Sequence, residues 1–247
     1  MPKLTEKEQQ ARKRACLALD VPTVPEALSL AEELAPYFET SKVGKQLHIA
    51  AGSEGINIVR ELEERGIGTF LDLKFHDTPN TVYEASRACA VPGVYMFNLH
   101  IAGGEEMCRR AIDGASDGII TRPKVIGVTV LTSLDDEDLK AQGLGVSYND
   151  LLRRRTELAK KWGLDGVVCP ANKAGELEKE FGSDFLYVTP DIKWADKQGA
   201  GQKQLYTPDR AVRDCSNSML VIGSAVTKAK DKPGTAYKIL QAMAAEL

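Results

Sequence analysis

The stretch GTFLDLKFHDTPNTVYEASRACA, residues 68–90, contains one complete unit of the fold that this sequence predicts. Its first part, residues 68–75, is a mostly apolar run with the length of a buried strand, and residues 78–90 carry apolar side chains at helical spacing. Between the two parts, Thr78 precedes Pro79, an order typical of a helix N-cap followed by the first helical position. The stretch therefore predicts a β-strand that leads into an α-helix.

The same alternation of strand and helix recurs along the whole chain. Strands are expected at residues 16–20, 41–44, 68–75, 94–100, 124–131, 166–170, 185–190 and 219–224. Helices are expected at residues 25–38, 53–65, 78–90, 104–115, 150–162, 173–181, 208–214 and 234–247. Eight such units predict an α/β protein with a single (β/α)8 TIM barrel over residues 16–247 and a short helical N-terminal extension at residues 1–15. A doubly wound open sheet is the alternative, because local patterns do not show whether the first and last strands meet.

The composition excludes several classes of function. The chain has 247 residues with 32 Lys and Arg against 35 Asp and Glu, a net charge of −3 that argues against binding to nucleic acid or to an anionic membrane. Basic clusters at residues 12–14 and 153–155 are interpreted as solvated helix faces. Five scattered cysteines and three distant histidines show no metal-binding spacing. With a polar N-terminus and no membrane-length apolar run, the sequence predicts a cytoplasmic protein.

Charged side chains gather at the ends of the first three predicted strands. Asp72 and Lys74 lie two residues apart, so they share one face of the third strand at its carboxyl end, where barrel enzymes place catalytic groups. Asp77 follows in the next loop. Lys42 and Asp20 lie at the equivalent ends of the second and first strands. This cluster is either a catalytic site or a structural ion pair that closes the mouth of the barrel.

A second informative region joins the last two predicted strands. Residues 191–206 form a polar segment long enough to act as a lid over a site. After the eighth strand, Gly223 and Ser224 offer backbone N–H groups and a hydroxyl at the position where many barrels bind phosphate.

With these residues in place, the chain resembles the orotidine 5'-monophosphate decarboxylase family. Asp72, Lys74 and Asp77 match the D-x-K-x-x-D signature of that family. Shorter matches are ALD at residues 18–20, KVG at 42–44, VTVLTSL at 128–134 and VTP at 188–190. The resemblance implies a barrel homodimer that converts orotidine 5'-monophosphate to uridine 5'-monophosphate and CO2 in de novo pyrimidine biosynthesis. It also implies that the reaction needs neither a metal nor an organic cofactor.

The resemblance further implies roles for the charged residues. Lys74 would protonate the pyrimidine carbon that loses CO2, and Asp72 would lie beside the departing carboxylate. Lys42 would pair with Asp72 and touch the ribose. Asp77 would reach, together with Thr81, into the site of the neighbouring subunit.

The remaining roles concern binding of the substrate. Asp20 would accept a hydrogen bond from the ribose, Thr132 or Ser133 would read the pyrimidine edge, and Gln202 would bridge the base and the phosphate. Further binding residues are expected at Pro190, Lys193, Gly223 and Ser224. His76 and His100 are expected to support the catalytic groups through hydrogen bonds rather than to react themselves.

The sequence departs from the family pattern near the phosphate. Ser224 stands where the family usually has an arginine, Lys193 replaces a second common arginine, and Asp191 replaces a glycine. Because a lysine or serine does not reproduce bidentate guanidinium binding, phosphate binding is expected to be weaker or rearranged, with the decarboxylation residues intact. Two other functions remain open: a catalytically impaired nucleotide-binding barrel, and a related sugar-phosphate decarboxylase.

Overall fold

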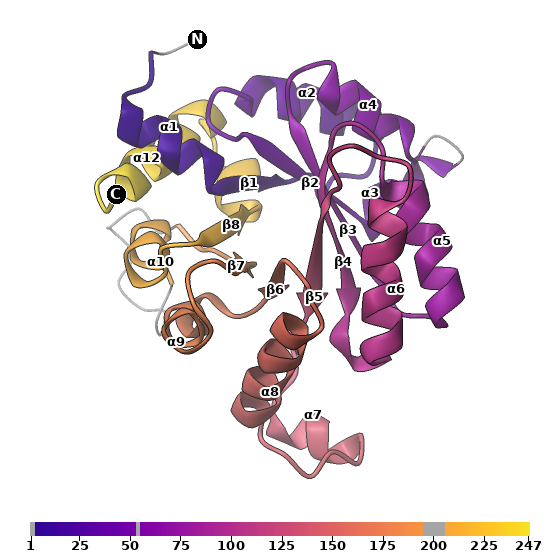
Figure 1. Ribbon diagram of the computed structural model, residues 1–247. Coiled ribbons are helices and arrows are strands. Elements are labelled where there is room, and N and C mark those ends of the chain that lie inside the picture. Colours follow the sequence, from indigo (N-terminus) through magenta and orange to yellow (C-terminus); the bar gives the residue numbers. More distant parts are fainter. Residues whose placement is uncertain (1–2, 53–54, 195–205) are drawn as a thin grey trace.

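Eight parallel strands form a closed barrel in a computed structural model that describes residues 3–52, 55–194 and 206–247. The strands pair in chain order, and β8 pairs with β1 (Figure 1). Their bounds are β1 Ala15–Ala18, β2 Thr40–Gly44, β3 Gly68–Phe75, β4 Val94–His100, β5 Lys124–Val128, β6 Gly166–Val168, β7 Leu186–Thr189 and β8 Ser218–Ile222. The predicted (β/α)8 barrel is confirmed, and the open sheet is excluded because the first and last strands are paired.

The helices surround the ring of strands (Figure 1). They are α2 Val24–Leu34, α3 Lys45–Ala50, α4 Asn57–Glu63, α5 Pro79–Cys89, α6 Glu105–Ser116, α7 Asp136–Ala141, α8 Tyr148–Lys161, α9 Ala171–Phe181, α10 Pro208–Asp214, α11 Ser224–Thr227 and α12 Lys232–Ala244, with a 3-10 turn η2 at Ile101–Gly103. No helix in the described ranges is both long and apolar enough to span a bilayer.

The N-terminal extension contains helix α1, Glu6–Lys13, which lies beside α12 (Figure 1). Thr5 and Glu8 form a reciprocal capping box at its start. Directly after the helix, the Arg14 guanidinium donates to the backbone oxygens of Cys215 at 2.5 Å and Ser218 at 3.1 Å. The prediction that this basic cluster is only a solvated face was therefore wrong for Arg14, which ties the extension to the barrel.

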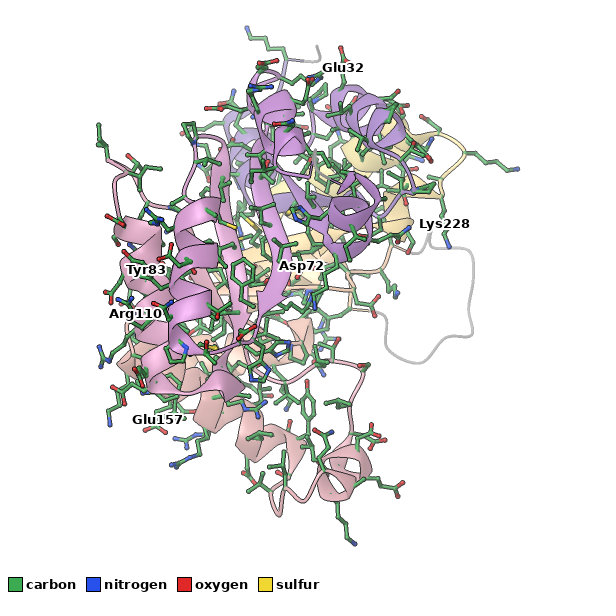
Figure 2. The ribbon with its side chains drawn as sticks, turned by 90° about the vertical axis from the view of Figure 1, so that its right-hand side faces the viewer. Glu32, Asp72, Tyr83, Arg110, Glu157 and Lys228 are labelled. Atoms are coloured by element: carbon green, nitrogen blue, oxygen red, sulfur yellow. The ribbon has the colours of Figure 1, made fainter. Side chains whose placement is uncertain are left out.

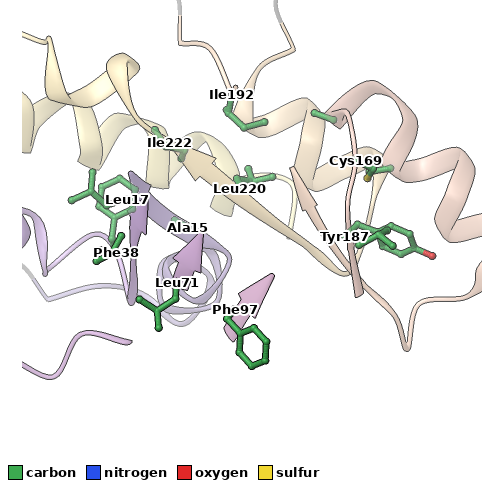
Figure 3. Packing of buried hydrophobic residues seen from close by; sticks show 14 of the residues in the cluster. Ala15, Leu17, Phe38, Leu71, Phe97, Cys169, Tyr187, Ile192, Leu220 and Ile222 are labelled. Atoms are coloured by element: carbon green, nitrogen blue, oxygen red, sulfur yellow. The ribbon is translucent and has the colours of Figure 1, made fainter. Parts of the chain in front are cut away.

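Alternation of side chains along the strands produces two apolar layers. The inner layer fills the barrel and consists of Cys16, Ala18, Phe70, Met96, Ile126, Leu186, Val188, Met219 and Val221. The larger outer layer lies between strands and helices; Figure 3 shows part of it, including Leu17, Leu71 and Tyr187. Because apolar side chains fill most of the barrel, charged side chains that point inward are tolerated best near its carboxyl-terminal mouth, where water has access.

Several predicted boundaries differ from the structure. The short helix α3 follows β2 at once, and in the described part of the helix predicted at residues 53–65, α4 spans Asn57–Glu63. Helix α7, capped by Asp135, was not predicted. Thr78 is the N-cap of α5, but its hydroxyl makes no cap bond and instead lies 2.9 Å from the hydroxyl of Thr81.

Candidate active site

Lys42 and Asp72 enter the barrel from neighbouring strands. Lys42 lies in register with Ala18 on β1 and Phe70 on β3, and both of these belong to the inner apolar layer. Its side chain therefore points into the barrel, and the residue is only 8% exposed. Asp72 lies two residues after Phe70 and shares its inward direction, near the carboxyl end of β3.

Asp72 holds two ammonium groups together. Its Oδ1 lies 2.5 Å from Lys74 Nζ, and its Oδ2 lies 3.4 Å from Lys42 Nζ. The Lys42 ammonium also donates to Asp20 Oδ1 at 3.0 Å. Four of the five charged residues that the sequence singled out are thus brought into one connected array at the mouth of the barrel.

Burial and neighbouring charges shift the pKa values of Lys42 and Asp72 in opposite directions. Burial lowers the pKa of Lys42, but the carboxylates of Asp72 and Asp20 outweigh it and hold that pKa above its ordinary value. Burial likewise raises the pKa of Asp72, yet the Lys42 and Lys74 ammonium groups reverse this and hold it below its usual range. Lys42 and Asp72 are consequently both charged at neutral pH.

The backbone at Lys74 has an unusual conformation. Its φ angle is 52°, in the left-handed region that few residues other than glycine adopt, and the pairing of β3 with β4 shifts register between Leu71 and Phe75. The Lys74 N–H donates to Oδ1 of Asn98 at 2.7 Å, and Asn98 Nδ2 donates to Asp72 Oδ1 at 2.8 Å. Asn98 was missed by sequence reasoning, although a polar amide inside the apolar strand 94–100 was a usable signal.

A small apolar cavity adjoins the charged array. Its volume is about 160 Å³, and Lys42, Asp72 and Lys74 lie on its wall. The rest of the lining is Phe70, Val128, Val130, Leu131, Thr132, Val168, Val188, Pro190 and Val221. Such a cavity suits a flat ring, and its low polarity strengthens the field of the nearby charges.

A second cavity of about 470 Å³ continues from the first, because Lys42, Asp72, Pro190 and Val221 line both. Its remaining lining residues are Ala18, Asp20, Asp191, Ile192, Gly223, Ser224, Thr227 and Lys228. Gly223 and Ser224, which were predicted to bind substrate, thus line this cavity, and so do Thr227 and Lys228, which were not predicted. Figure 2 shows Asp72 in the middle of the molecule and Lys228 at its edge.

The cations near the second cavity differ in their partners. Lys193 forms an ion pair with Asp191, whose φ angle of 61° is left-handed. Lys193 lines neither cavity. Within the described ranges, no carboxylate lies within ion-pair distance of the exposed Lys228 ammonium. Lys228 thus places a positive charge at the wall of this cavity.

The other predicted site residues lie outside both cavities. Asp77 and Thr81 are exposed, and the Asp77 carboxylate accepts a hydrogen bond from the N–H of Thr78 at 2.6 Å. Ser133 is also exposed, whereas its neighbour Thr132 lines the apolar cavity. Gln202 lies outside the described residues, together with most of the segment predicted to act as a lid.

The two histidines contact each other rather than the charged array. Their rings, His76 and His100, lie 5.4 Å apart, and the hydrogen bonds expected of them are absent from the described part of the chain. Burial, with His76 and Lys45 adding to it, lowers the pKa of His100 to about 4. Nearby, Arg155 donates to the backbone oxygen of Thr129 at 2.6 Å. The prediction that residues 153–155 form a solvated helix face was therefore wrong for Arg155.

A metal site is not evident in residues 3–52, 55–194 and 206–247, where no three His, Cys, Asp or Glu side chains are grouped to hold an ion.

Comparisons with known proteins agree with this geometry. Residues 13–239 match the model of the "Orotidine 5'-phosphate decarboxylase / HUMPS family". The orotidine 5'-phosphate decarboxylase of Sodalis glossinidius is 40% identical over 233 residues, covering 94% of this chain and 91% of that protein. The enzyme of the same name from Saccharophagus degradans is 39% identical, covering 94% of this chain and 93% of that protein.

A solved structure extends the likeness to three dimensions. The crystal structure of orotidine 5'-phosphate decarboxylase from Lactobacillus acidophilus superposes with a TM-score of 0.81 at 31% identity, over 94% of this chain and 99% of that one. The matched region contains all eight strands and the charged array at their carboxyl ends. The chain belongs to the orotidine 5'-phosphate decarboxylase / HUMPS family.

Proposed function

We propose that this chain is an orotidine 5'-phosphate decarboxylase that converts orotidine 5'-monophosphate to uridine 5'-monophosphate and CO2 in pyrimidine biosynthesis. The observation that carries the proposal is the Asp72 carboxylate held between the Lys42 and Lys74 ammonium groups at the wall of an apolar cavity. Charges held this firmly beside a ring-sized cavity suit a reaction in which a ring carbon acquires negative charge.

The reaction assigned to the array consists of one bond cleavage followed by one proton transfer. The bond between the ring carbon and the carboxylate breaks, CO2 leaves, and the electron pair stays on the carbon. The Lys74 ammonium stabilises this carbanion and donates a proton to it, and water later restores the proton to Lys74. Asp72 holds both lysines in place, and its charge opposes the substrate carboxylate until CO2 has left.

The two connected cavities accommodate the two ends of the substrate. We place the pyrimidine ring in the apolar cavity, with Thr132 at its edge and Ser133 available from the same loop. The ribose then lies beside Asp20 and Lys42, where the cavities meet. The phosphate occupies the larger cavity, against Gly223 and Ser224, with Pro190 between the two ends and with Gln202 contributing from the β7–α10 connection, while Lys193 stays paired with Asp191.

Lys228 supplies a positive charge to the phosphate in place of the arginine that the family usually has at the position of Ser224. It lines the larger cavity together with Ser224 and Thr227, and no described carboxylate neutralises it. An ammonium is a compact charge without the paired donors of a guanidinium, so phosphate binding is weaker than with arginine.

The working enzyme is a homodimer in the cytoplasm. Asp77 and Thr81 are exposed and line neither cavity of their own chain, which supports their contribution to the site of a second copy. All five cysteines are free and buried, as is usual for a protein of a reducing compartment.

Mixed dimers test the shared site. Lys74→Ala and Asp77→Ala subunits are each expected to be inactive alone. A mixed dimer contains one intact site, so random mixing is expected to restore about a quarter of wild-type activity. Absence of any restored activity, with mixed dimers present by native mass spectrometry, would contradict the sharing of Asp77.

Loss of absorbance from orotidine 5'-monophosphate tests the activity itself. Wild-type protein is expected to turn over this nucleotide with and without a chelator, and Lys74→Ala to lose about 10⁴-fold or more in kcat. Replacement of the exposed Lys238 on α12 by alanine serves as the matched control and keeps full activity. Nucleotide binding by calorimetry without release of CO2 would instead indicate an inactive binding barrel.

The family name also includes HUMPS, so a sugar-phosphate reaction is the second candidate. Turnover of a sugar phosphate that stops on chelation, with orotidine 5'-monophosphate left unchanged, would favour it over the proposed activity.

A further inference from the structure

We propose that Asn98 is a positioning residue for the decarboxylation, because one buried amide holds the Asp72 carboxylate and the Lys74 backbone at the same time. The inference rests on the proposed function, in which Asp72 and Lys74 carry the chemistry. Asn98 lies on β4, is fully buried with 0% exposure, and touches neither cavity. It therefore acts through its neighbours rather than on the substrate.

The orientation of the Asn98 amide follows from its partners. The Lys74 N–H can only donate a hydrogen bond, and an ionised Asp72 carboxylate can only accept one. The amide oxygen must therefore face Lys74, at 2.7 Å, and the amide nitrogen must face Asp72, at 2.8 Å. Asparagine supplies a donor and an acceptor in one planar group, and few other side chains of this size can do so.

The bond to Lys74 compensates for a break in the sheet. At φ 52°, a lysine backbone is strained, and it persists only where surrounding contacts hold it. The β3–β4 ladder is irregular between Leu71 and Phe75, and the Lys74 N–H bonds to the Asn98 side chain instead of to a strand backbone. Asn98 thus sets the direction in which the Lys74 side chain leaves β3.

The bond to Asp72 divides the two carboxylate oxygens between different partners. Asn98 Nδ2 and Lys74 Nζ both donate to Oδ1, while Oδ2 faces Lys42. Without the amide, the carboxylate is free to rotate and to share its oxygens differently between the two ammonium groups. A displacement of about 1 Å in a catalytic group can cost on the order of 100-fold in rate.

Asn98→Ala tests the inference against a matched control. The control is Asn217→Ala, because Asn217 also spans two partners with its amide, the backbone oxygens of Ser183 at 2.9 Å and Phe185 at 3.1 Å, at the opposite end of the barrel. Both variants are expected to lower Tm. Only Asn98→Ala is expected to lower kcat, by about 10- to 100-fold, with KM within about threefold of wild type.

Asn98→Asp adds a readout that a purely structural role would not change. The new carboxyl group can still accept from the Lys74 N–H, but it can donate to Asp72 only when it is protonated. Its kcat is therefore expected to increase as the pH falls, relative to wild type measured at the same pH. If Asn98→Ala fails to fold, Asn98→Ser, whose hydroxyl can donate and accept, replaces it in the comparison of kcat with KM.

The outcomes separate this inference from the proposed function. A wild-type protein without turnover of orotidine 5'-monophosphate would overturn the proposed function, and this inference with it. An active wild type whose Asn98 variants keep the wild-type kcat and pH profile, while losing Tm as Asn217→Ala does, would overturn the role of Asn98 alone.

Discussion

The two ends of the proposed substrate site are built in different ways. At the decarboxylation end, Lys42, Asp72 and Lys74 are linked to one another and to a fully buried asparagine. At the phosphate end, Ser224 and Lys228 are exposed. A reacting carbon requires groups fixed within fractions of an ångström, whereas a phosphate far from the chemistry supplies binding energy that several side chains can provide.

Asp72→Asn probes the decarboxylation end and is expected to have the largest effect on kcat. The amide keeps the shape of the side chain but leaves Lys42 and Lys74 without their shared counter-charge, so kcat is expected to fall by about 10³-fold. KM is not expected to rise, because the opposition to the substrate carboxylate also disappears. Steady-state kinetics measure both quantities. Asp184→Asn, at an exposed ion pair with Lys160, is the control, and equal effects of the two changes would contradict the assignment.

Lys228→Ala probes the phosphate end, where a smaller effect, confined to substrate binding, is expected. KM is expected to rise about tenfold with kcat nearly retained, because one charge-assisted contact to the phosphate is lost. Orotidine, which lacks the phosphate, should show no difference between variant and wild type. Ser224→Arg introduces the guanidinium of the family pattern and is expected to lower KM. A Lys228→Ala variant that is equally impaired on both substrates would contradict a phosphate contact.

Replacement of His100 is expected to have the smallest effect, on the free energy of unfolding rather than on catalysis. Its pKa of about 4 in the folded protein, against an ordinary 6.5, means that the unfolded chain binds more protons between these pH values. The stability due to neutral His100 is therefore fully present above pH 6.5 and is lost as the pH falls through 4. His100→Gln is expected to reduce this loss.

Urea denaturation of wild type and His100→Gln at about pH 7 and about pH 5 tests this prediction. For each protein, the quantity compared is the fall in the urea midpoint between the two pH values. Lys45, Lys74, His76 and Arg155 face His100 and are present in both proteins, so the difference between variant and wild type isolates the His100 imidazole. An identical fall in midpoint for wild type and variant would contradict the buried neutral form.

Most of the barrel could be predicted from local patterns, and the errors have local causes. Helix α3 was missed because six residues are too few to show a helical period, and α7 was missed because its capping signal lies in a polar loop. Arg14 and Arg155 were misjudged because their long side chains reach backbone oxygens that are distant in sequence.

The charged array could be predicted only in part. Two-residue spacing on a strand was enough to place Asp72 and Lys74 on one face, because strand periodicity is a local property. The bond from Asn98 joins residues 26 apart in sequence, and Lys228 reaches the cavity from beyond the last strand. Such contacts depend on how strands neighbour one another and therefore leave no periodic signal.

The amino-acid sequence by itself determined the alternation of strands and helices, the charges at three strand ends and the family pattern. Each of these depends on residues within a few positions of one another. Only the tertiary structure decided that the barrel closes, that Asp72 divides its oxygens between two lysines, and that Lys193 is paired while Lys228 is available. These features arise when closure brings distant strand ends to one mouth, where burial makes every charge and hydrogen bond depend on its neighbours.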